Sequence, residues 1–126
     1  MHMHFLPNSL SDPIFETYLR ETHRIKDYRD VRDNLLPQLF ASFAALSTRL
    51  QIRFNCSNRF EGQYPAIRIQ CPVGFVPDEI QIEFPHQRQS FVVHHTGQMM
   101  TIHGQENLHH HLRVILTIGL AQWFPT

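Results

Sequence analysis

The 126-residue sequence lacks an excess of either charge, a long hydrophobic run and a cysteine motif. Lys and Arg together number 11, as do Asp and Glu, so the formal net charge is zero. Because a protein that holds nucleic acid through its phosphates needs a basic surface, we expect no nucleic-acid partner. The apolar runs are far shorter than the roughly 20 residues of a membrane-spanning helix, so we expect no membrane insertion.

Cysteine is scarce, with Cys56 and Cys71 as its two instances. Both fall in predicted strands, which favours a small, buried, apolar role and a reducing compartment such as the cytoplasm. Residues 1–10 lack the basic segment and long apolar stretch of a secretory signal. We expect a flexible segment over 1–10 within a single domain that spans 1–126. Because Thr126 closely follows the last predicted helix, we also expect the domain to belong to a longer chain.

Histidine is frequent, with 10 residues that include the triplet 109–111. Two helical histidines share a metal at a spacing of three or four residues, whereas consecutive ones point about 100° apart. No carboxylate or cysteine set completes a tetrahedral site. We therefore predict no metal and no cofactor, and we expect the triplet to form a solvated face of the last helix.

Apolar and polar residues alternate with a period of two over 48–56, 64–71 and 79–84. This alternation is typical of half-buried antiparallel strands. A short apolar run at 91–93 is a candidate fourth strand, whereas 94–104 shows little regular pattern. The strands are separated by glycine- and proline-containing stretches, which predict loops.

Helical patterns flank the strands. Ser11-Asp12-Pro13 predicts a helix start, and a stripe of apolar residues continues to Ile25. A polar interruption follows at 26–30, and a second stripe contains Pro37, which predicts a break near 34–37. A last helix is expected over 106–121. The predicted fold class is α+β, with an antiparallel meander of three or four strands packed against N-terminal helices and one C-terminal helix.

The strand region also resembles a known family. Phe60-Glu61-Gly62, Cys71-Pro72 and Phe75-Val76 stand at the spacing of the Tyr-x-Gly, Phe-Pro and Tyr-Pro elements of ubiquitin-conjugating enzymes. With its flanks this resemblance covers about three quarters of the chain. It implies the ubiquitin-conjugating-enzyme-like fold, and the RWD domain is a smaller relative with the same order of elements.

The resemblance argues against catalysis. Active members carry a nucleophilic cysteine three residues after a glycine, beyond the sheet, and a His-Pro-Asn motif nearby. Here Gly97-Gln98-Met99-Met100 puts Met100 at that position, and His94-His95-Thr96 replaces the motif. Because a thioether cannot form the ubiquitin thioester, we expect no enzyme but a ubiquitin-conjugating enzyme variant, or UEV, domain.

Tyr28-Arg29-Asp30-Val31 and the apolar last helix are similar to the ubiquitin- and late-domain-binding subunit of ESCRT-I. This likeness implies a protein-binding module in endosomal sorting of ubiquitinated cargo at multivesicular bodies, cytoplasmic and associated with endosomes. The implied partners are ubiquitin, proline-rich Pro-Thr/Ser-Ala-Pro peptides and, in a longer chain, other ESCRT-I subunits. Two alternatives stay open: an inactive cofactor of a conjugating enzyme that builds lysine-63-linked chains, and an RWD-type structural adaptor.

The resemblance also implies site residues. The peptide groove of the ESCRT-I branch corresponds to Phe60, Tyr64, Phe91, Thr117 and Ile118. Without a one-residue deletion Pro65 takes the place of Tyr64, and Ser90 is the alternative to Phe91. As an alternative, Phe60 and Tyr64 plug the edge of the sheet. The short first hairpin leaves the polar face of the sheet for ubiquitin, at Gln51, Arg53, Arg68 and Gln70. Outward polar residues are, however, common to any half-solvated sheet.

Overall fold

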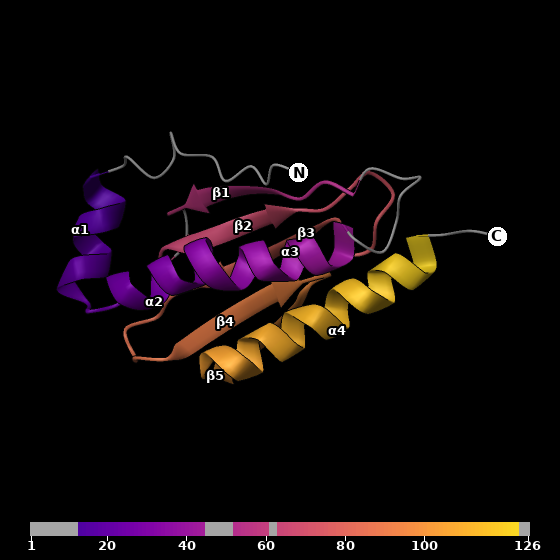
Figure 1. Ribbon diagram of the computed structural model, residues 1–126. Coiled ribbons are helices and arrows are strands. Elements are labelled where there is room, and N and C mark those ends of the chain that lie inside the picture. Colours follow the sequence, from indigo (N-terminus) through magenta and orange to yellow (C-terminus); the bar gives the residue numbers. More distant parts are fainter. Residues whose placement is uncertain (1–12, 45–51, 61–62, 124–126) are drawn as a thin grey trace.

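The computed structural model describes residues 13–44, 52–60 and 63–123. Within them five strands form one antiparallel sheet in the order β1-β2-β3-β4-β5 (Figure 1). The strands are β1 Asn55–Arg59, β2 Ala66–Gln70, β3 Glu79–Glu83, β4 Ser90–His95 and β5 Gln98–His103. The helical elements are α1 Pro13–Glu21, α2 Ile25–Asp30, the π turn η2 Val31–Leu35, α3 Leu36–Ala44 and α4 Gln105–Trp123. The predicted α+β class is confirmed, with five strands in place of three or four.

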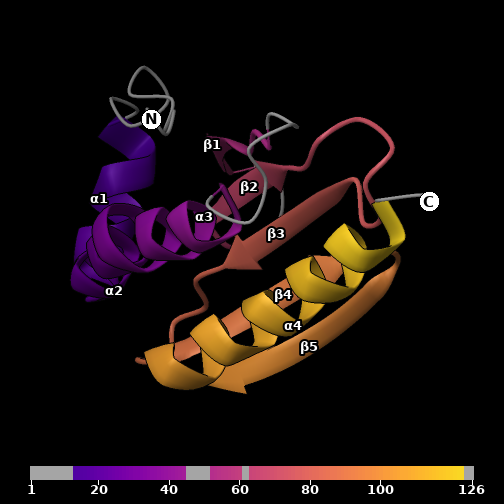
Figure 2. The ribbon, with the colours of Figure 1, turned by 45° about the vertical axis from the view of Figure 1, so that its right-hand side comes forward.

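The helices cover one face of the sheet. Helix α3 lies over the β1–β3 half and α4 lies over β4 and β5 (Figures 1 and 2). Alternate strand residues point to the helices, and Ile69, Ile80 and Val93 are fully buried there. The opposite face carries polar residues such as Arg68 and Gln81, as the alternation predicts. None of the helices in the described segments is long and apolar enough to cross a membrane.

Two strand predictions need correction. The first strand, expected over 48–56, pairs only from Asn55 onward, and residues 48–51 lie outside the described segments. Ile52 and Phe54 keep the buried side of the alternation, although they precede the ladder. Strand β5 was missed in the stretch 94–104. It is an edge strand in which Ile102 alone is buried. Because its other side chains are exposed, the strand needs no alternation of apolar and polar residues.

The helical boundaries also differ from the expectation. Residues 26–30 form α2 instead of an interruption, and the chain turns earlier, at His23, whose φ is 59°. There the Arg24 N–H donates to the carbonyl of Leu19 at 2.7 Å, which closes the end of α1. The break expected at 34–37 is the π turn, which ends just before Pro37 withdraws its N–H from the helix. The predicted start at Ser11 and the flexible segment 1–10 fall outside the described residues.

Arg24 joins the two halves of the fold although it is completely buried. Its Nη1 donates to the carbonyls of Pro85 and Gln87, the latter at 2.7 Å, and its Nε donates to Asp27 Oδ2 at 3.1 Å. The guanidinium also lies over the rings of Phe84 and Phe91, 5.7 and 5.3 Å from their centroids. Arg24 thereby fixes the α1–α2 turn to the β3–β4 loop.

Candidate functional site

Four aromatic rings meet beside helix α1, and we call Tyr18, Phe60, Tyr64 and His86 the aromatic cluster. Tyr18 lies 5.1 Å from Phe60 and 5.6 Å from His86 between ring centroids, and Tyr64 lies 5.5 Å from His86. The Tyr18 hydroxyl shares a hydrogen bond with His86 Nε2. The rings come from α1, the end of β1, the approach to β2 and the segment after β3. His86 is exposed and the other three are half-buried.

Two of the four rings, those of Tyr18 and Phe60, line a shallow apolar slot with a volume of about 350 Å³. Ile14 also lines the slot and is 72% exposed. Phe60 is held from behind by Phe15, whose ring centroid is 6.3 Å away. Burial, and then the charge of Tyr64, raises the pKa of Tyr18, so its phenol stays a neutral hydrogen-bonding group.

The structure brings together only part of the predicted peptide site. Phe60 and Tyr64 belong to the aromatic cluster, but Phe91 is fully buried beneath Arg24 and Phe84 and offers no surface to a ligand. Thr117 and Ile118 are exposed on α4, which covers the other half of the sheet. Sequence reasoning missed Tyr18 and His86 as members of the cluster. Tyr18 was assigned to an apolar stripe, and His86 stood in a stretch that had no pattern.

A second depression separates α4 from the edge of the sheet, and we call it the α4–β5 groove. Its volume is about 410 Å³, and it contains both Met100 and Ile118. No Asp, Glu, Lys or Arg lines the groove among the described residues. Apolar side chains and two histidines dominate its walls, namely Val76, Pro77, His95, Met99, Met100, His111, Val114, Ile115 and Ile118.

Met100 does not lie beyond the sheet, where the resemblance placed it. It is part of β5 and pairs with Val93 of β4. The prediction of a post-sheet segment over 97–101 is wrong because Thr96 and Gly97 turn the chain straight back into a fifth strand.

Both thiols are poor nucleophiles. Burial, and then Cys71, raises the pKa of Cys56 to about 12. Burial, and then Asp78 and Glu79, raises the pKa of Cys71 to about 12. A thiol reacts as its thiolate, which at neutral pH would then make up roughly one part in 10⁵.

The histidine triplet is not uniformly solvated. His110 is exposed, but His111 turns toward β4, where its ring centroid lies 6.0 Å from that of His95. His111 Nε2 is buried and has no hydrogen-bond partner among the described residues. Burial, and then His95 and His110, lowers the pKa of His111. Within the described ranges, no three His, Cys, Asp or Glu side chains are grouped so that they could hold a metal.

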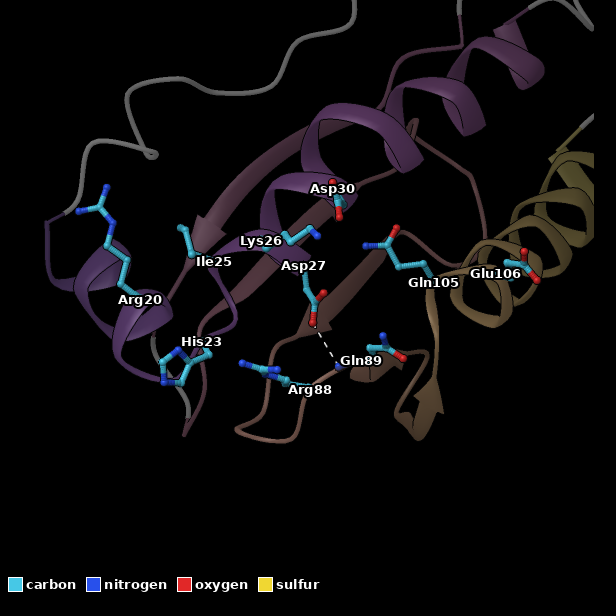
Figure 3. A pocket seen from close by; sticks show the side chains of 10 residues that line it. All are labelled: Arg20, His23, Ile25, Lys26, Asp27, Asp30, Arg88, Gln89, Gln105 and Glu106. Atoms are coloured by element: carbon cyan, nitrogen blue, oxygen red, sulfur yellow. Dashed lines mark hydrogen bonds between the residues drawn. The ribbon is translucent and has the colours of Figure 1, made fainter.

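A polar hollow lies where α1, α2, the β3–β4 loop and the start of α4 meet (Figure 3). Its volume is about 670 Å³. Basic residues line it from α1, α2 and the loop, but Asp30 and Glu106 lie among them. The hollow therefore favours neither an anionic nor a cationic ligand. Asp27 is already engaged, because its Oδ2 accepts from Arg24 Nε and from the Gln89 N–H at 3.1 Å each. None of the predicted site residues lines this hollow.

The predicted ubiquitin-facing residues are spread over the outer side of the sheet. Arg68 and Gln70 lie on β2, and Arg53 is exposed before β1; Gln51 is outside the described segments. The guanidinium of Arg68 forms an ion pair with Glu79, which also accepts from Gln81 Nε2 at 2.9 Å. Glu79 thereby links side chains of two neighbouring strands on the outer face of the sheet.

No protein-family model, curated protein or solved structure matches the chain.

Proposed function

We propose that this chain is a non-catalytic, ubiquitin-conjugating-like domain of the UEV type, which acts as a protein-binding module for proline-rich peptides. The observation that carries the proposal is the aromatic cluster, in which Phe60 and Tyr64 are joined by Tyr18 and His86. An extended proline-rich segment is stiff before it binds, so it loses little conformational entropy when its rings pack between aromatic side chains.

The cluster has the chemistry that such a ligand needs. Edge-to-face contacts at 5.1 and 5.5 Å hold neighbouring rings in place. The slot beside Phe60 offers the apolar side chain of Ile14, and the exposed His86 ring, which contacts Tyr18, offers a polar rim outside the slot. A Pro-Thr-Ala-Pro segment has two rings for the slot and a hydroxyl for that rim.

The absence of catalysis in this proposal is supported by Cys56 and Cys71. A ubiquitin thioester requires an accessible thiolate, whereas Cys56 is 1% exposed and both thiols have pKa values near 12. Assignment to ESCRT-I and to ubiquitin recognition is supported by the resemblance at Tyr28-Arg29-Asp30-Val31. In this proposal the outer sheet face around Arg68 and Gln70 is the surface for ubiquitin.

Amide chemical shifts during titration test the proposal. A Pro-Thr-Ala-Pro peptide and ubiquitin are added separately to the ¹⁵N-labelled chain. We expect the peptide to shift amides around Tyr64 and His86, and Tyr64→Ala to weaken binding at least tenfold. Ile118→Ala, which truncates an exposed side chain in the α4–β5 groove, is the matched control and should bind as the wild type does.

The outcomes separate the candidate functions. Shifts confined to Met100 and Ile118 would place the peptide site in the α4–β5 groove. If the peptide shifted no amides, the proposal of a peptide site would be rejected. The exposed Ile14 on α1 favours one other function, that of a cofactor which docks an active conjugating enzyme through its N-terminal helices. Lysine-63-linked chain synthesis that requires this chain and is lost in Ile14→Glu would support that function. If neither the peptide nor ubiquitin binds and the chain does not support chain synthesis, the remaining candidate is an adaptor of the RWD type.

A further inference from the structure

Strand β5 is an edge strand without the usual protection against pairing. In the described part of the chain no strand pairs with its outer side. Natural edge strands are blunted by charged residues, proline or bulges. The segment Gln98–His103 contains no Lys, Arg, Asp, Glu or Pro, and its pairing with β4 runs without a bulge. The edge is therefore able to accept another strand.

The β4–β5 hairpin fixes which backbone groups point outward. Its two-residue turn at 96–97 has positive φ values of 47° and 74°, as a type I′ turn requires. The paired residues His95 and Gln98 flank the turn and close the hairpin. The closing pair of such a hairpin exchanges two hydrogen bonds, and every second pair after it does the same. The remaining residues of β5 direct their N–H and C=O groups away from β4, namely Met99, Thr101 and His103.

The same edge borders most of the exposed large hydrophobic side chains of the described residues. Seven large hydrophobic residues are exposed in the described segments, and five of them line the α4–β5 groove. Met99 is 70% exposed, Met100 53% and Ile118 54%. Apolar side chains gathered next to an unpaired strand mark a surface that another polypeptide covers. The five are Val76, Met99, Met100, Val114 and Ile118.

We propose that the occupant of this edge is a second copy of the chain, with β5 pairing antiparallel to β5 across a two-fold axis at Thr101. The two sheets then form one continuous sheet with the helices of both copies on the same face. Thr101 meets Thr101 of the partner subunit in a hydrogen-bonded pair, as its outward backbone groups require. Met100 meets Ile102 of the partner subunit on the helix-covered face, where both residues point.

Two features favour a second copy over an unrelated strand. First, the edge residues carry no fixed charge, so a two-fold axis opposes no like charges across the strands. Second, α4 lies over β4 and β5 (Figure 2). With strands about 4.8 Å apart, a helix centred on that pair stands roughly 10 Å from its symmetry mate, which is an ordinary helix-packing distance. Val114 and Ile118 would then be covered, whereas a single added strand would leave α4 exposed.

Sedimentation velocity of the full chain over a hundredfold range of concentration tests the proposal. We expect a reversible monomer–dimer equilibrium. Thr101→Lys and Thr101→Glu each place like charges on the axis and should weaken dimerisation at least tenfold. An equal mixture of the two variants should restore the dimer, because Lys then faces Glu. Gln70→Lys, an exposed change on the outer face of β2, is the control and should dimerise as the wild type does.

A wild type that stays monomeric throughout overturns the proposal, as does a dimer that is indifferent to both Thr101 variants. Thr101 is exposed, so circular dichroism and thermal unfolding should show that the variants fold normally. The edge is separate from the aromatic cluster, so this result and that of the peptide titration are independent.

Discussion

Replacing Gly119 with alanine would test how closely α4 packs on the loop that precedes β3. Gly119 is buried in α4, and an added Cβ would stand 2.3 Å from Phe75 Cε1 and 2.6 Å from the carbonyl oxygen of Val76. Neither neighbour can retreat easily. The Phe75 ring is 2% exposed and packs between Phe54 and Trp123, at 6.0 and 5.9 Å between centroids, and the Val76 oxygen belongs to the backbone.

Two effects of opposite sign decide the result. Alanine in place of glycine within a helix stabilises it by about 1 kcal/mol. Overpacking a filled site costs about 1–3 kcal/mol and more where backbone must move, as it must here. We expect the clash to dominate and the free energy of unfolding to fall by about 2 kcal/mol. For a domain of this size that corresponds to a melting temperature lower by roughly 8 °C.

Urea unfolding followed by circular dichroism measures this difference, and equal slopes for both proteins would show that the denatured states match. Thr117→Ala, an exposed change in the same helix, is the control and should be neutral or slightly stabilising. A Gly119→Ala protein as stable as the wild type would refute the close packing of α4 against Phe75 and Val76.

Four further predictions concern buried polar groups. Arg24→Met leaves two loop carbonyls without their donor and should cost about 3–5 kcal/mol in urea unfolding. Burial raises the pKa of Tyr28 to about 12. The stability that the neutral phenol confers is therefore complete below the unfolded pKa near 10 and is lost as pH rises toward 12. A spectroscopic titration of tyrosinate measures this pKa, and Tyr28→Phe should remove this part of the pH dependence. Cys56 should react with iodoacetamide at least a hundredfold more slowly in the native chain than in urea. The lowered pKa of His111 favours its neutral form in the folded chain, so the free energy of unfolding should fall as pH drops below about 6.5. In His111→Gln the free energy of unfolding should depend less on pH in this range.

The sequence predicted the α+β class and the inner strands β2 and β3 because those strands are half-buried. In β2 and β3 one face meets the helices and the other meets water, so Ile67, Ile69, Ile80 and Ile82 alternate with polar residues and the pattern is visible. The stretch of β5 could not be recognised in this way. An edge strand with one buried residue has its structure imposed by the turn at Thr96 and by backbone pairing, and neither leaves a hydrophobic period.

The aromatic cluster was half predictable. Phe60 and Tyr64 are near in sequence and could be proposed as one surface. Tyr18 and His86 join them only because Arg24 fixes the α1–α2 turn to the loop after β3, and no local pattern reports a contact between residues that far apart. The predicted contribution of Phe91 failed for a related reason, since the buried guanidinium of Arg24 covers its ring.

The π turn at Val31–Leu35 sets the phase of the helix that follows it. Successive residues of an α-helix are rotated by about 100°, whereas a π turn spreads nearly the same total rotation over one more residue. Deleting Asn34 would therefore convert the π turn into regular α-helix, and Leu39, Phe40 and Phe43 would keep facing the interior. An insertion would instead rotate these three side chains away from the core, because the turn already holds one extra residue. The stretch should therefore tolerate the loss of one residue far better than the gain of one.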